Sequence, residues 1–377
     1  MKPLLALLLV TVLGLTACSD TEPGGPRPAL PGPTATRAAP KADLVGIVDD
    51  PEARIVGVTV RRSDPSVRSV VWSLCRTPKC HRADEVIAVT ADGFATRHLH
   101  ALPQQTLETP LDGVYLLTDR RGAEILQPDG SRTPVDWQAG APGPLVRAEH
   151  PVGIHRFGRV HAVDTTTGAG HLVPTPGEAL GVHLDGSGAL RIQVSDPRGV
   201  GARLLSSYDG GRTWDERSAF EPPAGRIMQP LDSSTTTAAV VTGGDGATLL
   251  PVGGLHRADG SGWRRIPGFE GPTAYLGEGG GAVLPDGRLL LSVASWSSGR
   301  RPAGLWLSDG RDWSDLRPVP MGPPFDSLDP RTAYPPVLDI LAAPRKVTVY
   351  AVDDSRRGHT LWSSTDAGHT WTELAAR

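Results

Sequence analysis

Short apolar stretches separated by polar turns run through most of the chain and predict antiparallel β-structure. Clear β-rich stretches are Arg54–Val60, Ala238–Thr242, Leu289–Val293 and Lys346–Tyr350. Nine Asp-Gly dipeptides lie between such stretches, and Asp-Gly between two apolar runs is a strong signal for a β-hairpin. After residue 17 no long stretch has apolar residues at helical spacing. We therefore expect an all-β body built from hairpins, beginning with a strand near 43–48.

The first residues read as an export signal. Lys2 precedes an almost unbroken apolar run from Leu4 to Leu15, which is too short to span a bilayer comfortably and fits the core of a signal peptide. The following Leu15-Thr16-Ala17-Cys18 resembles the lipobox of bacterial lipoproteins. That resemblance implies cleavage after residue 17, lipid such as palmitate on Cys18, and a place on the extracytoplasmic face of the cell membrane. A secreted protein with an incidental cysteine at this position is the alternative.

Composition divides the remaining chain into a tether and a body. Residues 18–42 are rich in Pro, Gly, Ala and Thr, a composition typical of an extended linker. The whole chain has 45 Gly and 36 Pro, which fits a turn-rich fold. Residues 43–377 form a segment long enough to bury a hydrophobic core. Lys and Arg (38) nearly balance Asp and Glu (41), so the net charge favours neither nucleic acid nor anionic lipid.

Two cysteines remain once Cys18 carries lipid. In an oxidising compartment Cys75 and Cys80 are expected to form a disulfide that closes a short loop. A metal site there would need two further ligands, and only His81 is adjacent. We therefore expect a disulfide, with neither a metal nor another cofactor.

The pattern S-x-D-x-G-x-T-W occurs twice. Its fixed positions are Ser207, Asp209, Gly211, Thr213 and Trp214 in the first copy, and Ser364, Asp366, Gly368, Thr370 and Trp371 in the second. These residue types suit a hairpin turn, because the carboxylate can accept backbone N–H groups and glycine adopts positive φ. The pattern resembles the aspartate box (BNR repeat) of sialidases and many other β-propellers. The resemblance implies a structural role on the rim of a propeller.

Weaker copies suggest how many blades the propeller has. The repeat predicts seven equivalent points, at Trp72, Tyr115, His161, Leu205, Leu255, Trp306 and Trp362. Successive points are 43 to 56 residues apart, which fits the size of a four-stranded blade. In the first copy Trp72 leads to Cys75, so that a disulfide would replace the polar turn. We expect seven four-stranded blades, with six or eight as alternatives.

Catalytic residues are harder to find. The likeness to sialidases would require three arginines around a substrate carboxylate, an acid/base aspartate and a tyrosine activated by a glutamate. The motif Arg265-Ile266-Pro267 occurs late in the chain, after a rim turn, which speaks against a catalytic role. Three tyrosines lie outside rim-like turns, Tyr275, Tyr334 and Tyr350, and none has an assignable partner.

Histidines offer no metal signature. His150, His155, His161 and His171 are close in sequence, and His98 and His100 share one face of any strand, but these spacings match no known ligand pattern.

The sequence therefore favours a binding or scaffold propeller on a lipidated stalk that recognises a protein or glycan of the cell envelope. The alternative is an exo-sialidase-like glycoside hydrolase. An enzyme would place arginines and carboxylates together on the innermost strands, and a binding module would place mixed polar and aromatic loops there. The ligand and the oligomeric state have no signal in the sequence.

Overall fold

In the computed structural model the strands of Asp43–Arg377 form a seven-bladed β-propeller. The structure describes residues 43–377 except 76–82, 103–106, 121, 147–148, 155–157, 196–200, 223–226, 244–249, 260–261, 268–273, 296–303, 326–336 and 353–358. The predicted signal peptide, Cys18, the linker, His155, Tyr334 and Cys80 lie outside the described residues, so the lipid anchor and the Cys75–Cys80 disulfide stay predictions. Among the described helices, none has the length and apolar character needed to cross a membrane.

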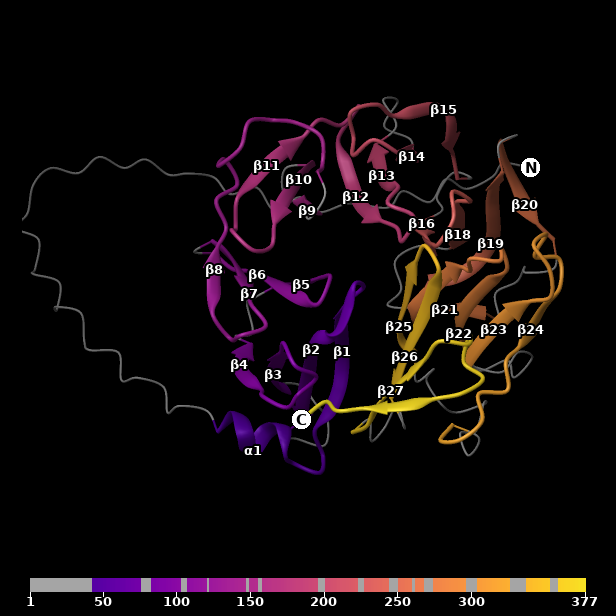
Figure 1. Ribbon diagram of the computed structural model, residues 1–377. Coiled ribbons are helices and arrows are strands. Elements are labelled where there is room, and N and C mark those ends of the chain that lie inside the picture. Colours follow the sequence, from indigo (N-terminus) through magenta and orange to yellow (C-terminus); the bar gives the residue numbers. More distant parts are fainter. Residues whose placement is uncertain are drawn as a thin grey trace, which may run out of the picture. The chain divides into compact units, whose positions relative to one another are not determined.

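The blades follow one another around a central axis (Figure 1). Blades 1 to 4 contain β1 (Arg54–Arg61), β2 (Asp64–Cys75), β3 (Ala83–Thr90) and β4 (His98–Leu102); β5 (Leu107–Leu111), β6 (Val114–Thr118), β7 (Ala123–Leu126) and β8 (Arg132–Pro134); β9 (Glu149–Ile154), β10 (Arg159–Asp164) and β11 (Gly170–Val173); and β12 (Ala179–Leu184), β13 (Leu190–Ser195), β14 (Ala202–Ser207) and β15 (Asp215–Phe220).

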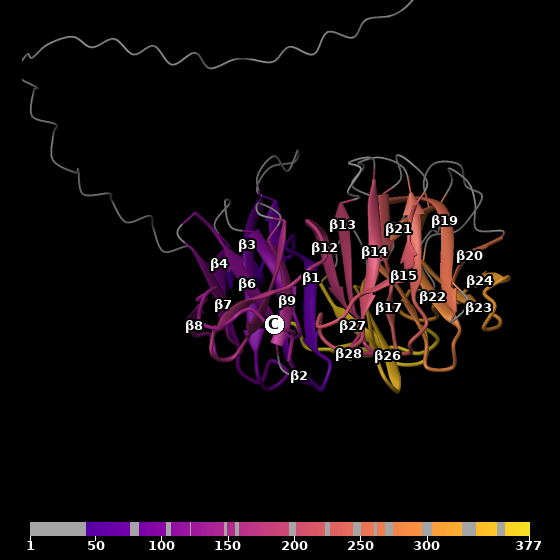
Figure 2. The same cartoon turned by 90° about the horizontal axis from the view of Figure 1, so that it is seen from above.

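Blades 5 to 7 contain β16 (Ile227–Pro230), β18 (Ala239–Gly243), β19 (Leu250–Asp259) and β20 (Gly262–Ile266); β21 (Ala274–Val283), β22 (Leu289–Ser295), β23 (Gly304–Ser308) and β24 (Leu316–Pro318); and β25 (Val337–Ala343), β26 (Lys346–Val352), β27 (Leu361–Ser364) and β28 (Thr372–Leu374). The short β17 (Asp232–Ser233) leaves blade 5 and pairs in parallel with β21 of blade 6. Neighbouring strands within a blade are antiparallel, as β12, β13 and β14 show in the view turned by 90° (Figure 2).

Blade 3 takes its outer edge from the chain that precedes β9. The Gly140 N–H donates to the Gly170 carbonyl at 3.1 Å, and the Gly143 N–H donates to the Leu172 carbonyl at 3.0 Å. The segment 136–143 thus lies along β11 where the other blades have a fourth strand, so this blade departs from the regular order.

The hydrophobic core is divided among the contacts between blades. Seven clusters of buried side chains each join residues of two neighbouring blades, and one of them joins blade 7 to blade 1. On β3, Val86 and Ala88 belong to the cluster shared with blade 7, whereas Ile87 and Val89 belong to the cluster shared with blade 2. A strand buried on both faces needs apolar residues at successive positions, which explains why its sequence does not alternate.

Among the described strands, none is shared between blades 1 and 7. The segment after β28 crosses to blade 1, where Arg68 Nη2 donates to the Ala375 carbonyl at 2.9 Å and Trp72 Nε1 donates to the Ala376 carbonyl at 3.3 Å. The Arg377 guanidinium lies 4.9 Å from the centre of the Trp72 ring. Side chains and backbone carbonyls therefore close the ring at this junction.

A short helix precedes β1, so the expected strand near 43–48 was wrong. Helix α1 (Leu44–Val48) begins after Asp43, whose carboxylate accepts the Gly46 N–H at 2.9 Å. A side-chain acceptor at this position stabilises the first turn of a helix. Ile47 and Val48 are buried in the cluster between blades 1 and 7, so this helix caps the junction.

The two S-x-D-x-G-x-T-W segments fold into the same turn. In the first, Ser207 Oγ donates to Asp209 at 2.8 Å, the Gly211 N–H donates to Ser207 Oγ at 2.7 Å, and Thr213 Oγ1 donates to Asp209 at 2.6 Å. The second segment repeats these bonds among Ser364, Asp366, Gly368 and Thr370 at 2.8, 2.8 and 2.6 Å.

The turn tryptophans join adjacent blades. Trp214 Nε1 donates to the Pro174 carbonyl at 3.1 Å, and Trp371 Nε1 donates to the Met321 carbonyl at 2.7 Å. Pro174 follows the last strand of blade 3, and Met321 follows the last strand of blade 6. Each tryptophan thus bonds its own blade to the preceding one.

A third turn of this kind, Thr90–Thr96 in blade 1, was missed in the sequence. Thr90 Oγ1 donates to Asp92 at 2.8 Å, the Phe94 N–H donates to Thr90 Oγ1 at 2.9 Å, and Thr96 Oγ1 donates to Asp92 at 2.7 Å. Phe94 takes the glycine position with a φ of 73°. Hydrogen bonds from the Thr96 amide and hydroxyl lower the pKa of Asp92 to about 2.

The assignment of equivalent points was therefore partly wrong, although the seven blades are confirmed. Leu205, Leu255, Trp306 and Trp362 lie on third strands, whereas Trp72, Tyr115 and His161 lie on the second strands β2, β6 and β10. The turn of blade 1 follows Thr90, so no disulfide near Cys75 replaces it.

Candidate binding site in the central channel

A cavity of about 1020 Å³ opens within the ring. Strands β1, β5, β9, β12 and β25 line it, together with the turns that follow β1, β5, β12 and β14. This volume lies at the upper end of the range for ligand pockets, roughly 300–1,000 Å³. Five blades therefore contribute to one concave surface.

Asp232 of β17 joins four blades beside this cavity. Its Oδ1 accepts the Gly186 N–H of blade 4 at 2.7 Å and the N–H of the next residue, Ser233, at 2.9 Å. Its Oδ2 accepts the Ala342 N–H of blade 7 at 2.8 Å and Arg62 Nη2, next to β1 of blade 1, at 3.1 Å. Burial alone would raise the pKa of Asp232, but His183, Arg62 and the Ala342 N–H outweigh burial and lower it. The carboxylate is therefore a structural centre of the ring.

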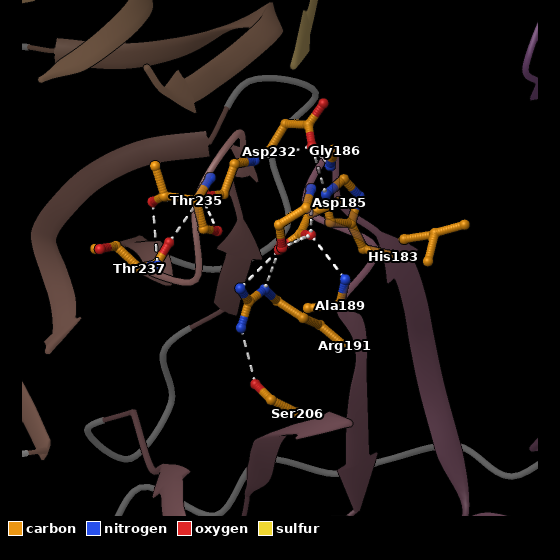
Figure 3. Close-up of polar contacts among 12 residues, drawn as sticks. His183, Asp185, Gly186, Ala189, Arg191, Ser206, Asp232, Thr235 and Thr237 are labelled. Atoms are coloured by element: carbon orange, nitrogen blue, oxygen red, sulfur yellow. Dashed lines mark hydrogen bonds and ion pairs between the residues drawn. The ribbon is translucent and has the colours of Figure 1, made fainter. Parts of the chain in front are cut away.

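A second polar network positions Gly186. Asp185 Oδ2 accepts Arg191 Nη2 at 2.6 Å, and Arg191 Nη1 donates to Ser206 Oγ at 2.8 Å (Figure 3). Asp185 and Arg191 side chains are fully buried. Asp185 Oδ1 also accepts the Ala189 N–H at 3.0 Å, which fixes the turn between β12 and β13. Buried charges are tolerated when they are paired and hydrogen-bonded in this way.

Asp339 of β25 is the chemically unusual group on the cavity wall. Burial, followed by the negative charge of Asp232, raises its pKa to about 7. Asp339 is partly accessible and is one of the residues that line the cavity. His183 of β12 lies nearby, with Nε2 3.8 Å from Asp232 Oδ1, and this buried nitrogen has no hydrogen-bond partner among the described residues. The site thus holds a carboxyl that changes charge near neutral pH.

The predicted candidates do not meet in this site. Arg265 lies on β20, the outer strand of blade 5, and donates to the Gly253 carbonyl at 3.0 Å. Tyr350 is buried on β26, and burial raises its pKa. Arg62 is the one arginine on the described cavity wall. The structure therefore does not bring the arginines of a sialidase-type site together among the residues it describes.

The histidines are also dispersed. His150, His161 and His171 lie on the three strands of blade 3, and His98 and His100 lie on β4. His171 Nδ1 is 3.4 Å from Glu149, and the His161 ring packs against Trp137. In the part of the chain that the structure describes, no three His, Cys, Asp or Glu side chains are grouped to hold a metal ion.

Comparison with known proteins supplies no family. No known protein family matches the chain, and no curated protein sequence matches it. Among solved structures, the β-propeller domain of the Trilobed protease from Pyrococcus furiosus is 10% identical, with 86% of this chain and 95% of that one covered and a TM-score of 0.46. A prolyl endopeptidase is 13% identical over 85% of this chain, which spans about half (48%) of that protein, with a TM-score of 0.48.

The N-terminal domain of Nup159 is another similar structure, with 11% identity, 83% of this chain and 89% of that chain covered, and a TM-score of 0.38. Likenesses this distant carry no functional argument. The seven blades rest on the strand pairing of this chain itself.

The residues that build the site do not belong to any recognisable sequence motif. Asp185 and Gly186 form one of the Asp-Gly dipeptides and were predicted only as a hairpin turn. Asp232 and Asp339 each stand alone among apolar and small residues. An aspartate within a buried strand, as Asp339 is on β25, was the one available signal.

Proposed function

We propose that the protein is a lipid-anchored binding propeller on the extracytoplasmic face of the membrane, which recognises a protein or glycan of the cell envelope. The observation that carries the binding role is the cavity of about 1020 Å³, which five blades line with mixed polar, aliphatic and aromatic residues. Most charged groups around it stabilise turns or join blades. The ring thus supplies a rigid concave surface, as binding sites require.

The sequence supports the anchor. Leu15-Thr16-Ala17-Cys18 resembles a lipobox, and residues 18–42 have the composition of a tether. The turn type resembles the aspartate box, which fits a scaffold role for those residues. A disulfide between Cys75 and Cys80 would stabilise the fold by about 2 kcal/mol after export. The sialidase alternative is less favoured, because Arg62 is the one arginine on the described cavity wall.

Metabolic labelling with an alkynyl palmitate tests the anchor. We expect the wild type and the control Thr21→Ala to be labelled and to sediment with membranes, and Cys18→Ala to be unlabelled. Label that persists in Cys18→Ala, or a wild type without label, would refute lipidation at this position.

Crosslinking in intact cells, followed by purification from the envelope, tests the binding role. Tyr208 and Val146 border the cavity and are 59% and 57% exposed, so Tyr208→Ser with Val146→Ser should reduce partner recovery at least fivefold without unfolding the protein. Val45→Ser, at an exposed position on α1, is the matched control and should keep the wild-type recovery. Equal recovery by all three proteins would exclude the cavity mouth as the binding surface.

A further inference from the structure

The cavity wall has an excess of negative charge. The residues that line it include one arginine, Arg62, and five acidic residues, of which Asp185 is fully buried and neutralised by Arg191. The five acidic residues are Asp112, Glu149, Asp185, Asp209 and Asp339. A concave surface with one dominant sign of charge concentrates ligands of the opposite sign.

Four of these carboxylates already have partners inside the protein. Asp185 pairs with Arg191, and Asp209 accepts the Thr213 hydroxyl. Asp112 accepts the Arg62 N–H at 2.7 Å, and Glu149 accepts the Val146 N–H at 2.8 Å. Asp339 has no side-chain donor among the described residues, and the backbone N–H of Ile340 favours its ionised form only partly.

The cation nearest to Asp339 is committed elsewhere. The Arg62 guanidinium donates to Asp232 at 3.1 Å and to the Leu184 carbonyl at 3.4 Å. Burial and the charge of Asp232 disfavour ionisation of Asp339 in the free protein, and its pKa is raised to about 7. A second cation in the cavity would remove this penalty, because an opposite charge stabilises a carboxylate.

We propose that the cavity receives a lysine or arginine side chain of a partner protein, whose charge pairs with Asp339. This inference rests on the proposed binding function and specifies the chemistry of the partner.

The border of the cavity favours a protein over a free amine. Tyr208 and Val146 expose large apolar surfaces beside the cavity, and tyrosine is typical of the centre of protein interfaces. An aromatic ring can also attract the cation as it enters. The volume of about 1020 Å³ admits more than one side chain of an inserted loop.

A small probe tests the charge requirement directly. Nα-acetyl-lysine methylamide is titrated into the purified full-length protein and followed by NMR, with its Nε-acetylated, neutral form as the control ligand. We expect the charged probe to bind and the neutral form to bind at least tenfold more weakly. Asp339→Asn should weaken the charged probe at least tenfold, whereas Asp339→Glu should retain part of the binding. Equal binding of both probes, or binding unchanged by Asp339→Asn, would overturn the inference.

The pH dependence gives a second readout. The charged groups that face Asp339 are Asp232, Arg62 and His183, with the Tyr350 hydroxyl on the adjacent strand. Asp339 is ionised above its pKa of about 7, so probe binding should weaken about tenfold from pH 8 to pH 6. Asp339→Asn should lose this dependence. A wild type whose probe binding is independent of pH would contradict the assigned carboxylate.

Partner recovery separates this inference from the proposed function. Asp286→Asn, a change in an exposed turn, is the matched control and should recover the partner like the wild type, while Asp339→Asn should recover at least fivefold less. A partner recovered equally by Asp339→Asn would overturn the inference and leave the binding function standing. Probe binding that depends on Asp339, with partner recovery unaffected, would identify a free amine as the ligand and refute the protein partner. No partner with any variant would refute the proposed function itself.

Discussion

The substitution Asp232→Asn tests whether one carboxylate holds the ring together. An amide keeps one oxygen, which can still accept the Gly186 and Ser233 N–H groups. Its NH₂ group then faces two donors, the Ala342 N–H and the Arg62 guanidinium, which the carboxylate now satisfies at 2.8 and 3.1 Å. Both of these bonds are lost in the variant.

The magnitude follows from these two contacts. A buried donor without an acceptor costs about 1–3 kcal/mol, and this applies to the Ala342 N–H. The Arg62 side chain is 28% exposed, so water replaces part of the lost ion pair and its contribution is about 1 kcal/mol. We expect the free energy of unfolding to fall by about 2–4 kcal/mol. For a domain of this size the melting temperature then falls by at most about 4–8 °C.

Thermal unfolding followed by tryptophan fluorescence at pH 6 measures the effect. At this pH Asp232 is ionised, because its pKa lies below the ordinary value of 3.8. Asp339, with a pKa of about 7, is mostly protonated and uncharged at pH 6. Removing the charge of Asp232 therefore relieves little repulsion between the two groups, and the expected loss of stability is not offset. Asp286→Asn, whose ion pair with Arg288 is exposed, should change the stability by less than about 0.5 kcal/mol. An Asp232→Asn protein as stable as this control would refute the role of Asp232 as the centre of the ring.

Three further predictions concern single positions. For Asp339 the folded-state pKa of about 7 exceeds the ordinary 3.8. As the pH rises from 4 to 7, the free energy of unfolding of the wild type should therefore fall by up to about 4 kcal/mol. In denaturant titrations across that range, Asp339→Asn should show no such fall. In Gly186→Ala the new Cβ would overlap the Ala342 carbonyl oxygen and should destabilise the fold by about 1–3 kcal/mol, whereas Gly201→Ala has open space and should unfold like the wild type. Burial would raise the pKa of Asp366, but the hydrogen bonds of its turn hold this pKa at about 2. The contribution of Asp366 to the free energy of unfolding should therefore be present above pH 4 and lost as the pH falls to 2. Between pH 4 and pH 2 the free energy of unfolding of Asp366→Asn should depend less steeply on pH than that of the wild type.

Local patterns in the sequence predicted the four strands β1, β18, β22 and β26 and two of the three described turns of this type. The hydrogen bonds of such a turn join residues only two to four positions apart, so their donors and acceptors can be read from one short segment. Thr90–Thr96 escaped notice because threonine and phenylalanine replace the serine and glycine of the pattern, although the bonds are the same.

The equivalence of the blades was harder to predict. Second and third strands are both buried and apolar, as Trp72 on β2 and Trp306 on β23 illustrate. The spacing of such residues reports the length of a blade and not the strand on which each lies. For this reason seven blades could be predicted while three of the seven markers lay on the wrong strand.

The sequence by itself determined the all-β class, the size of the repeat and the chemistry of the turns, because these depend on neighbours along the chain. Only the tertiary structure decided the site. Asp232 meets Arg62, Gly186 and Ala342 across separations of 170, 46 and 110 positions, and no local pattern encodes such contacts. Closing the ring places the inner strands around one axis, and this brings isolated residues together and changes the pKa of Asp339.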